Sequence, residues 1–430
     1  MKLFEPLVLK FEDGNWALDP ELGLIDTILE LNPRLIKMFE EDITQGRPSF
    51  TFGRQDTPSV EQIMRAAIYK EMKGLDYRSL EYAQEDSRIC EQFVKIDRLL
   101  PYSFQVWQKY ICRISEGKLE KFMMELNRIA IGEGLEDLES FRQDSTVVET
   151  NIHYPTNNSL VWDCIKESER LLKHLKKEIG DLSYEQYGKA AKKTYFKINV
   201  SQSEGEREKL FIKQLNLFTN SINQVSNIVK KKQGYGTTAK AAKQLEALEK
   251  LLAIMEKIYS MAERKEILKE MVSAEEKVFS IYEVHTDIIV KGKRDVQFGH
   301  KINLGSGKSN LILTCEIVEG NPKDSELYQP TIEKYKEYYG KAPNSSVADG
   351  GYASLDNLQF SKEAGIANTV FNKIRGSMQN IAKNKWVETK LKKWRSGIEA
   401  VISNLKRGFE IRRCNWKGFA HYRQLECNWI

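Results

Sequence analysis

One long helical stretch separates two strand-like parts of this 430-residue chain. Residues 139–150 (ESFRQDSTVVET) have the β-branched content and partial alternation of a strand. After Pro155 the pattern stays helical for more than a hundred residues, until strand-like segments return near residue 278. A strand needs partners to form a sheet. If the early strand and the late ones share a sheet, the intervening helices are an insertion.

From about residue 278, strand-like and helical segments alternate. The strand-like segments are 278–284, 296–303, 310–318, 345–348 and 366–372. The helical segments between and after them are 325–339, 355–363 and roughly 382–409. With the strand at 139–150, this order predicts an α/β fold whose mixed sheet is flanked by helices. The arrangement is ribonuclease H-like, with residues 160–277 inserted after the first strand.

Two heptad seams predict how the insertion folds. Apolar residues step by three and four along two segments: Phe211, Leu215, Phe218, Ile222, Val225 and Val229, then Leu245, Leu248, Leu252, Met255 and Tyr259. A basic, glycine-broken turn at 230–236 (KKKQGYG) lies between the seams. The pattern predicts an antiparallel coiled-coil hairpin. Its tip, with Lys230, Lys231 and Lys232, is either a DNA-backbone contact or a solvated turn.

Residues 1–135 have a helical pattern. Thr57-Pro58 is a predicted helix start, Gly74 a predicted stop, and Asp76 a cap for a second helix. Two helices joined by a short glycine-containing turn have the outline of a helix-turn-helix. An ordinary pair of antiparallel helices fits the same pattern.

Composition excludes several classes of protein. The 66 basic and 61 acidic residues leave a net charge of +5, and 41% of residues are hydrophobic, so wholesale disorder is not expected. No run of 18 apolar residues occurs, which predicts no membrane span. The six scattered cysteines are typical of reduced thiols in a cytosol, and charges in the first apolar stretch argue against a secretory signal.

Three acidic residues fall where the predicted fold would bring side chains together. Asp144 lies in the middle of the first strand, Asp349 ends a short strand before two glycines, and Glu399 lies on the last helix. Carboxylates that meet at a cleft are natural ligands for hard cations, and three of them can hold two Mg²⁺ or Mn²⁺ ions. Taken singly, each acid also fits a solvated or capping role.

The last predicted helix places Glu399 within a stripe of cations. On a continuous helix, Glu399 shares one polar face with Lys392, Arg395 and Lys406, opposite an apolar arc. This face fits a site at which a carboxylate and basic groups meet DNA. It fits equally an amphipathic surface helix with an Arg395–Glu399 pair. The region around it, 383–413, holds ten Lys or Arg against three acids, which suits a DNA groove.

Three blocks of the sequence carry a resemblance to a known family. The blocks are 144–148 (DSTVV) with 154–156 (YPT), then 348–352 (ADGGY), then Arg395-x3-Glu399-x6-Lys406. Together they resemble bacterial insertion-sequence transposases of the Asp-Asp-Glu (DDE) class, and the last block is similar to the end of their Tyr-x2-Arg-x3-Glu-x6-Lys signature. The resemblance spans about 140–410. Lys392 takes the place of the signature tyrosine, and Asn157 and Asn158 stand where the family often has an aspartate.

The resemblance implies DNA cleavage and strand transfer without a covalent enzyme intermediate. It implies that Asp144 contacts both of two Mg²⁺ or Mn²⁺ ions, and that Asp349 and Glu399 each complete one of them. Basic residues would bind DNA phosphates: Lys392, Arg395, Lys406, Arg407 and, on the insertion, Lys230, Lys231 and Lys232.

The same resemblance implies partners and a domain plan. The partners are double-stranded DNA, both the terminal inverted repeats and the target, and a second copy of the chain in a homodimer or larger assembly. The location is the bacterial cytoplasm, with the nucleoid. The plan has a helical DNA-binding region (1–135), a catalytic domain (136–412) interrupted by the insertion (160–277), and a tail (413–430). The alternatives are a nuclease that cuts without joining and a non-catalytic DNA-binding relative.

Overall fold

The computed structural model describes residues 18–45, 57–97, 99–231, 238–291, 295–374 and 376–428. The chain divides into two compact units. The first is formed by Met1–Glu149 together with His300–Ile430, and the second by Thr150–Gly299. Each unit is described below by itself.

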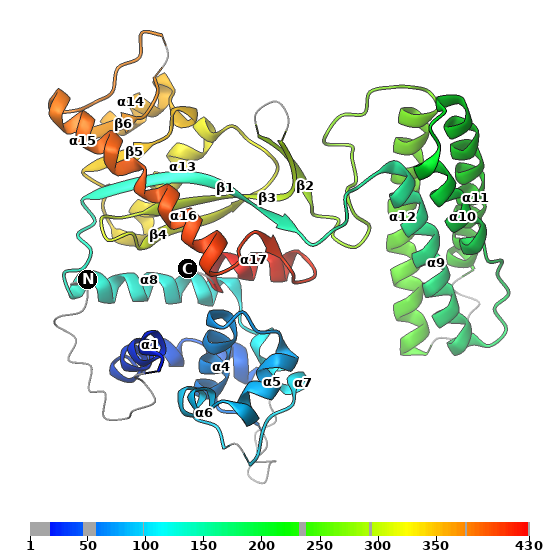
Figure 1. Ribbon diagram of the computed structural model, residues 1–430, viewed down its shortest axis with the longest axis horizontal. Coiled ribbons are helices and arrows are strands. Elements are labelled where there is room, and N and C mark those ends of the chain that lie inside the picture. The colour runs from blue at the N-terminus through cyan, green and yellow to red at the C-terminus, as the bar shows by residue number, and fades with distance from the viewer. Residues whose placement is uncertain are drawn as a thin grey trace. The chain divides into compact units, whose positions relative to one another are not determined.

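Short helices build the N-terminal part of the first unit (Figure 1). They are α1 (Pro20–Leu31), α2 (Arg34–Lys37), α3 (Glu40–Thr44), α4 (Val60–Met72), α5 (Tyr77–Asp86), α6 (Arg88–Val94), α7 (Phe104–Ile111) and α8 (Glu116–Gly132). The predicted helix pair is confirmed as α4 and α5, with Asp76 capping α5. The predicted start at Thr57-Pro58 is wrong. Ser59 caps α4 instead, because its side chain and that of Gln62 each accept the other's backbone N–H.

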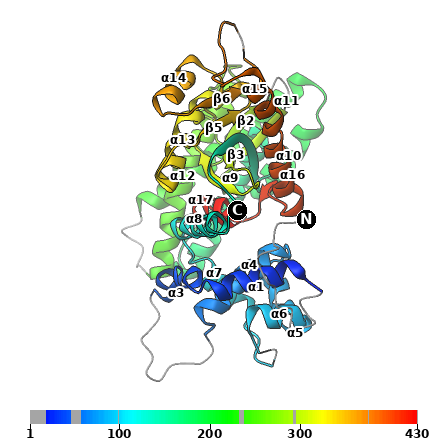
Figure 2. The same cartoon turned by 90° about the vertical axis from the view of Figure 1, so that its left-hand side faces the viewer.

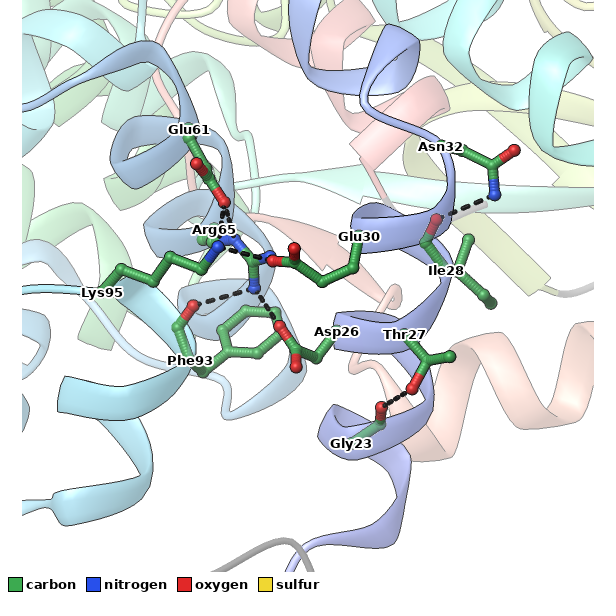
Figure 3. A network of polar contacts seen from close by, with 10 residues as sticks. All are labelled: Gly23, Asp26, Thr27, Ile28, Glu30, Asn32, Glu61, Arg65, Phe93 and Lys95. Carbon is green, nitrogen blue, oxygen red and sulfur yellow. Dashed lines mark hydrogen bonds and ion pairs between the residues drawn. The ribbon is translucent and has the colours of Figure 1, made fainter. Parts of the chain in front are cut away.

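A buried arginine joins three of these helices. Arg65 of α4 is fully buried, and its guanidinium pairs with Asp26 and Glu30 of α1 at 2.6 and 2.7 Å (Figure 3). The same group pairs with Glu61 at 2.9 Å and donates to the backbone carbonyl of Phe93 in α6. Every nitrogen of the guanidinium therefore has a partner, as burial of an ion requires.

Most of a mixed sheet lies in the first unit, and its residues 287–291 and 295–299 belong to the second. Its strands are β1 (Ser140–Thr150), β2 (Asp287–Lys291), β3 (Asp295–Ser306), β4 (Ile312–Val318), β5 (Ser345–Ala348), β6 (Asn368–Phe371) and the short β7 (Arg413–Cys414). The order is β2-β3-β1-β5-β6, with β4 beside β3 and β7 beside β1. β1, β5 and β6 run parallel, whereas β3 runs antiparallel to β4 and to β2. The mixed α/β class predicted from the sequence is confirmed.

Helices cover both faces of the parallel strands (Figure 2). These helices are α13 (Asp324–Tyr339), α14 (Leu355–Glu363), α15 (Lys385–Arg395), α16 (Gly397–Gly408) and α17 (Phe419–Asn428). Successive strand residues face opposite ways. Ala348 and Phe371 therefore join the core under α13 and α14, while Val347 and Val370 pack with Leu391 of α15.

Four helices share one core in the second unit (Figure 1). They are α9 (Asn157–Ile179), α10 (Gly188–Val200), α11 (Glu204–Lys230) and α12 (Ala239–Glu266). Most of the predicted seam residues of α11 and α12, such as Phe218 and Met255, are buried in this core. The structure adds α9 and α10 to the predicted hairpin, since buried side chains from all four helices pack together.

Two predicted elements are wrong. Residues 278–284 form no strand, because the hydroxyl of Ser280 accepts the backbone N–H groups of Tyr282 and Glu283 and folds the chain into a turn. The predicted helix at 382–409 is two helices, α15 and α16, that meet at Ser396. The structural cause of this break lies in the candidate site described below.

No helix in the described ranges has both the length and the apolar content needed to cross a lipid bilayer.

Candidate active site

Two neighbouring parallel strands bring the first two predicted acids together. The register of β1 and β5 pairs Gln143 with Ala348, and Asp144 and Asp349 are the next residues on each strand. Neighbouring strands lie about 4.8 Å apart. The pairing therefore places both carboxylates at one edge of the sheet, Asp144 within β1 and Asp349 directly after β5.

The third predicted acid reaches the same place from a helix. Glu399 lies in the first turn of α16, and its carboxylate accepts a hydrogen bond of 2.5 Å from Arg395 at the end of α15. The same guanidinium lies 3.7 Å from Asp144 and 3.8 Å from Asp349. The structure thus brings all three predicted acids around one arginine, although they come from separate parts of the chain.

Arg395 is held in this position by burial. Only 8% of the residue is exposed, and its Nε has no hydrogen-bond partner in the described part of the chain. Its Nη1 contacts Asp144 and Asp349, and its Nη2 contacts Glu399. One positive charge faces three negative charges, which leaves this cluster of side chains with a surplus of negative charge.

This surplus affects the protonation of Asp144. The pKa of the Asp144 carboxyl is raised from the ordinary 3.8 to about 6, chiefly by burial and also by the nearby charges of Asp349 and Asp324. A hydrogen bond from the backbone N–H of Ser145 and the charge of Arg395 act in the opposite direction. Asp144 is therefore a carboxylate short of positive partners at neutral pH.

Asp324 is a fourth acid at this place that sequence analysis missed. It is the first residue of α13, and its Oδ1 accepts hydrogen bonds from Ser145 Oγ at 3.2 Å and Lys301 Nζ at 3.0 Å. A Cβ on Gly351 would lie 3.0 Å from Oδ2 of Asp324, so the glycine leaves room for this carboxylate. The sequence pattern did not distinguish Asp324 from Glu326, since both are acids in the first turn of a helix.

Arg142 explains why the last helix breaks. It lies two residues before Asp144 on β1, is fully buried, and donates to the carbonyl of Trp394 at 2.7 Å. The guanidinium also lies against the Trp394 ring, 4.6 Å from its centroid. A Cβ on Gly397 would come within 2.0 Å of Arg142. Arg142 therefore occupies the space at the α15–α16 junction, and only glycine fits there.

The structure places the predicted DNA contacts as follows. Lys392 lies on α15 and pairs with Glu388 at 2.6 Å. Lys406 is half-buried and Arg407 is exposed, both near the end of α16. Lys230 and Lys231 are exposed at the end of α11 in the second unit, and Lys232 lies outside the described residues. Arg395, in contrast, contacts all three acids.

The donor set fits a hard divalent cation. Carboxylate oxygens are the ligands that Mg²⁺ and Mn²⁺ prefer, and the three acids already surround one positive charge, that of Arg395. With the side chains in these positions, no three acidic, histidine or cysteine groups among the described residues lie close enough together to hold a metal ion.

Comparison with known proteins identifies part of the chain. Residues 290–425 match the family model described as "Transposase DDE domain". This segment includes Asp349, Arg395 and Glu399, whereas Asp144 lies before it. No curated protein and no solved structure matches the chain. The match over 290–425 confirms the resemblance to transposases of the DDE class seen in the sequence.

Proposed function

We propose that this protein is a DDE transposase that cleaves DNA at transposon ends and joins the freed 3′ end to target DNA. The proposal rests chiefly on one observation. Asp144, Asp349 and Glu399 surround one buried guanidinium, in a chain whose residues 290–425 match a transposase DDE domain. The strand order and flanking helices support a ribonuclease H-like arrangement of the catalytic domain, with the four-helix unit inserted after β1.

Each residue of the site has a role in this proposal. Asp144, Asp349 and Glu399 would hold two Mg²⁺ or Mn²⁺ ions, which supply activation of the attacking oxygen and neutralisation of charge at the phosphate. Arg395 balances the acids when DNA is absent, and with Lys406 it binds phosphate when DNA is present. Arg142 fixes the distance between β1 and the start of α16, and so between two of the acids.

The reaction has two steps at phosphorus. A water molecule attacks the phosphodiester at the transposon end, and the departing 3′ oxygen takes up a proton to become a hydroxyl. This hydroxyl then attacks a phosphodiester of the target, whose own 3′ oxygen departs. Two ends must be joined together to the target, so a dimer or larger assembly on double-stranded DNA belongs to the proposal.

Substitution of the three acids tests the active site. Asp144→Asn, Asp349→Asn and Glu399→Gln should each reduce metal-dependent cleavage of labelled end DNA by about 10²–10⁴-fold, since each removes a carboxylate that would hold the ions at the reacting phosphate. Glu326→Gln is the matched control, because Glu326 is exposed and lies in the same helical turn as Asp324. Full cleavage by all three acid variants would show that the assignment is wrong.

A second assay separates the transposase from a nuclease of the same fold. DNA with a pre-cleaved 3′ hydroxyl at the transposon end is incubated with a target plasmid. A transposase joins the two, and the three acid variants do not. Cleavage without any joined product would instead favour the nuclease, and absence of both activities would favour a non-catalytic DNA-binding relative.

A further inference from the structure

Helix α10 of the second unit has a composition unlike that of its neighbours. Its sequence GKAAKKTYFKINV contains four lysines and no acidic residue. All four are exposed: Lys189, Lys192, Lys193 and Lys197. By contrast, α9, α11 and α12 each mix acidic and basic residues. A net charge of +4 on one short helix is therefore a local feature of α10.

The lysines share one face of the helix with two apolar side chains. Ala191, Thr194 and Ile198 are buried against the other helices. At 100° per residue the lysines fall on the opposite side, around Phe196 and Val200. Phe196 is 55% exposed and Val200 is 76% exposed. The outer face of α10 is thus a basic surface with an apolar centre.

None of these four lysines forms an ion pair with an acidic residue in the described part of the unit. Some cations on the neighbouring helices are paired instead, as in Lys250–Glu246 at 2.7 Å on α12 and Arg170–Glu167 at 2.6 Å on α9. The positive charge on α10 is therefore available to a partner that carries negative charge.

We infer that the outer face of α10 binds the phosphate backbone of duplex DNA, with Phe196 and Val200 against the sugars. This inference rests on the proposed function, which requires DNA next to the chain. Lysines bind phosphates without regard to base sequence. A second copy of the chain is a poor partner, because a two-fold contact would place the same four lysines against each other. A protein partner is disfavoured as well, since protein interfaces are depleted in lysine.

Salt dependence of DNA binding tests the inference in the full-length protein. The triple variant Lys192→Gln/Lys193→Gln/Lys197→Gln is compared with wild type by fluorescence anisotropy on a labelled duplex, at several KCl concentrations. Each phosphate contact contributes about 0.9 to the slope of log affinity against log salt. The slope should therefore fall by about 2–3 in the variant, and affinity at low salt should fall at least ~10-fold.

A matched variant on another helix is the control. Lys240→Gln/Lys243→Gln/Lys257→Gln removes the same charge from exposed positions of α12. Its slope should stay close to that of wild type. An equal change in both triple variants would mean that only net charge matters, and no change in the α10 variant would mean that DNA does not contact this face. Either result overturns the inference.

The variant Phe196→Ala distinguishes DNA from a second copy of the chain as the partner of the outer face of α10. It should weaken DNA binding several-fold and leave the salt slope unchanged, because it removes an apolar contact only. If Phe196→Ala instead changes the oligomeric state in sedimentation while DNA binding stays intact, the face binds a second copy and the inference is wrong. These readouts are binding measurements, so they fail independently of the cleavage assays on Asp144, Asp349 and Glu399.

Discussion

Asp144 is a carboxylate in surroundings that disfavour its negative charge. Its carboxylate is buried beside other negative charges, and burial raises its pKa to about 6. Arg395 offsets this only in part, from 3.7 Å. Such a group costs stability while it is ionised and without further cations. Strain of this kind at a site is typical of residues kept for function.

Because the ionised Asp144 destabilises the fold, we expect Asp144→Asn to be more stable than wild type when a metal chelator is present. The size of this gain should depend on pH. In unfolded protein this carboxyl titrates near 3.8, so between about pH 4 and pH 6 the folded protein keeps a proton that the unfolded chain loses. The free energy of unfolding therefore falls as pH rises through this window. Above pH 6, the ionised Asp144 lowers the free energy of unfolding by on the order of 3 kcal/mol, because a pKa shift of one unit is worth about 1.4 kcal/mol.

Urea unfolding at pH 4.5 and pH 8 measures this effect. Asp144→Asn should be more stable than wild type at pH 8, by up to ~3 kcal/mol, and the difference should shrink at pH 4.5. Glu326→Gln, an exposed acid-to-amide change, should show no such trend. A variant less stable than wild type at pH 8 would contradict the prediction.

The junction between α15 and α16 positions two parts of the site. Arg142 reaches from β1 to the carbonyl of Trp394, and Gly397 leaves the space for it. The break keeps Arg395 at the end of one helix and Glu399 at the start of the next, still in hydrogen-bond contact. The junction therefore acts as a spacer between β1 and Glu399.

Gly397→Ala tests this spacer. The new Cβ would overlap Arg142, and relief of such overpacking typically costs about 1–3 kcal/mol. We expect lower stability in urea and weaker end cleavage. Gly205→Ala is the control, because that helical glycine has open space around it, and an alanine there should be neutral or stabilising. Equal behaviour of the two variants would argue against a spacer role.

Arg65 joins α1, α4 and α6 by ion pairs to the half-buried Asp26 and Glu61 and the exposed Glu30, and by a hydrogen bond to the carbonyl of Phe93 (Figure 3). Arg65→Leu should destabilise the N-terminal helices by about 1.5–3 kcal/mol, because it removes the hydrogen bonds of a buried guanidinium while Glu30 and Glu61 keep Lys95 as a partner. Arg34→Gln, at an ion pair with Glu125 whose arginine is 63% exposed, should cost less than ~1 kcal/mol. Urea unfolding followed by circular dichroism compares the two.

At the scale of the whole molecule, the buried apolar clusters divide between the two units. The four-helix unit has a core of its own, and the sheet-containing unit has several others. The two units are covalently linked at 149–150 and within β3. Cooperative unfolding of a whole chain requires one shared core, so two units of this kind should unfold separately.

Differential scanning calorimetry should resolve two transitions. Phe218 of α11 and Phe371 of β6 are both fully buried, one in each unit. Phe218→Ala should lower one transition temperature and Phe371→Ala the other, each mutation costing about 3–5 kcal/mol. A single transition that both variants shift equally would show that the units unfold as one.

Local patterns were enough to predict most elements and the candidate acids. The sequence predicted β1, β3, β4, β5 and β6, helices α13 and α14, and the two helices α11 and α12, because strand and helix periodicity depend on neighbouring residues. It also singled out Asp144, Asp349 and Glu399, from their place in the predicted order of elements and from a family resemblance. The structure brings these three together.

Contacts between distant residues decided the rest. The break at Ser396 follows from Arg142, which lies more than 250 residues earlier in the chain, and Asp324 joins the site through Ser145 and Lys301. The turn at 280–283 formed where apolar residues predicted a strand. Sequence by itself determined which segments are helices and strands and which acids can meet. Only the tertiary structure decided which charges compensate them, because that depends on burial and on side chains brought together by folding.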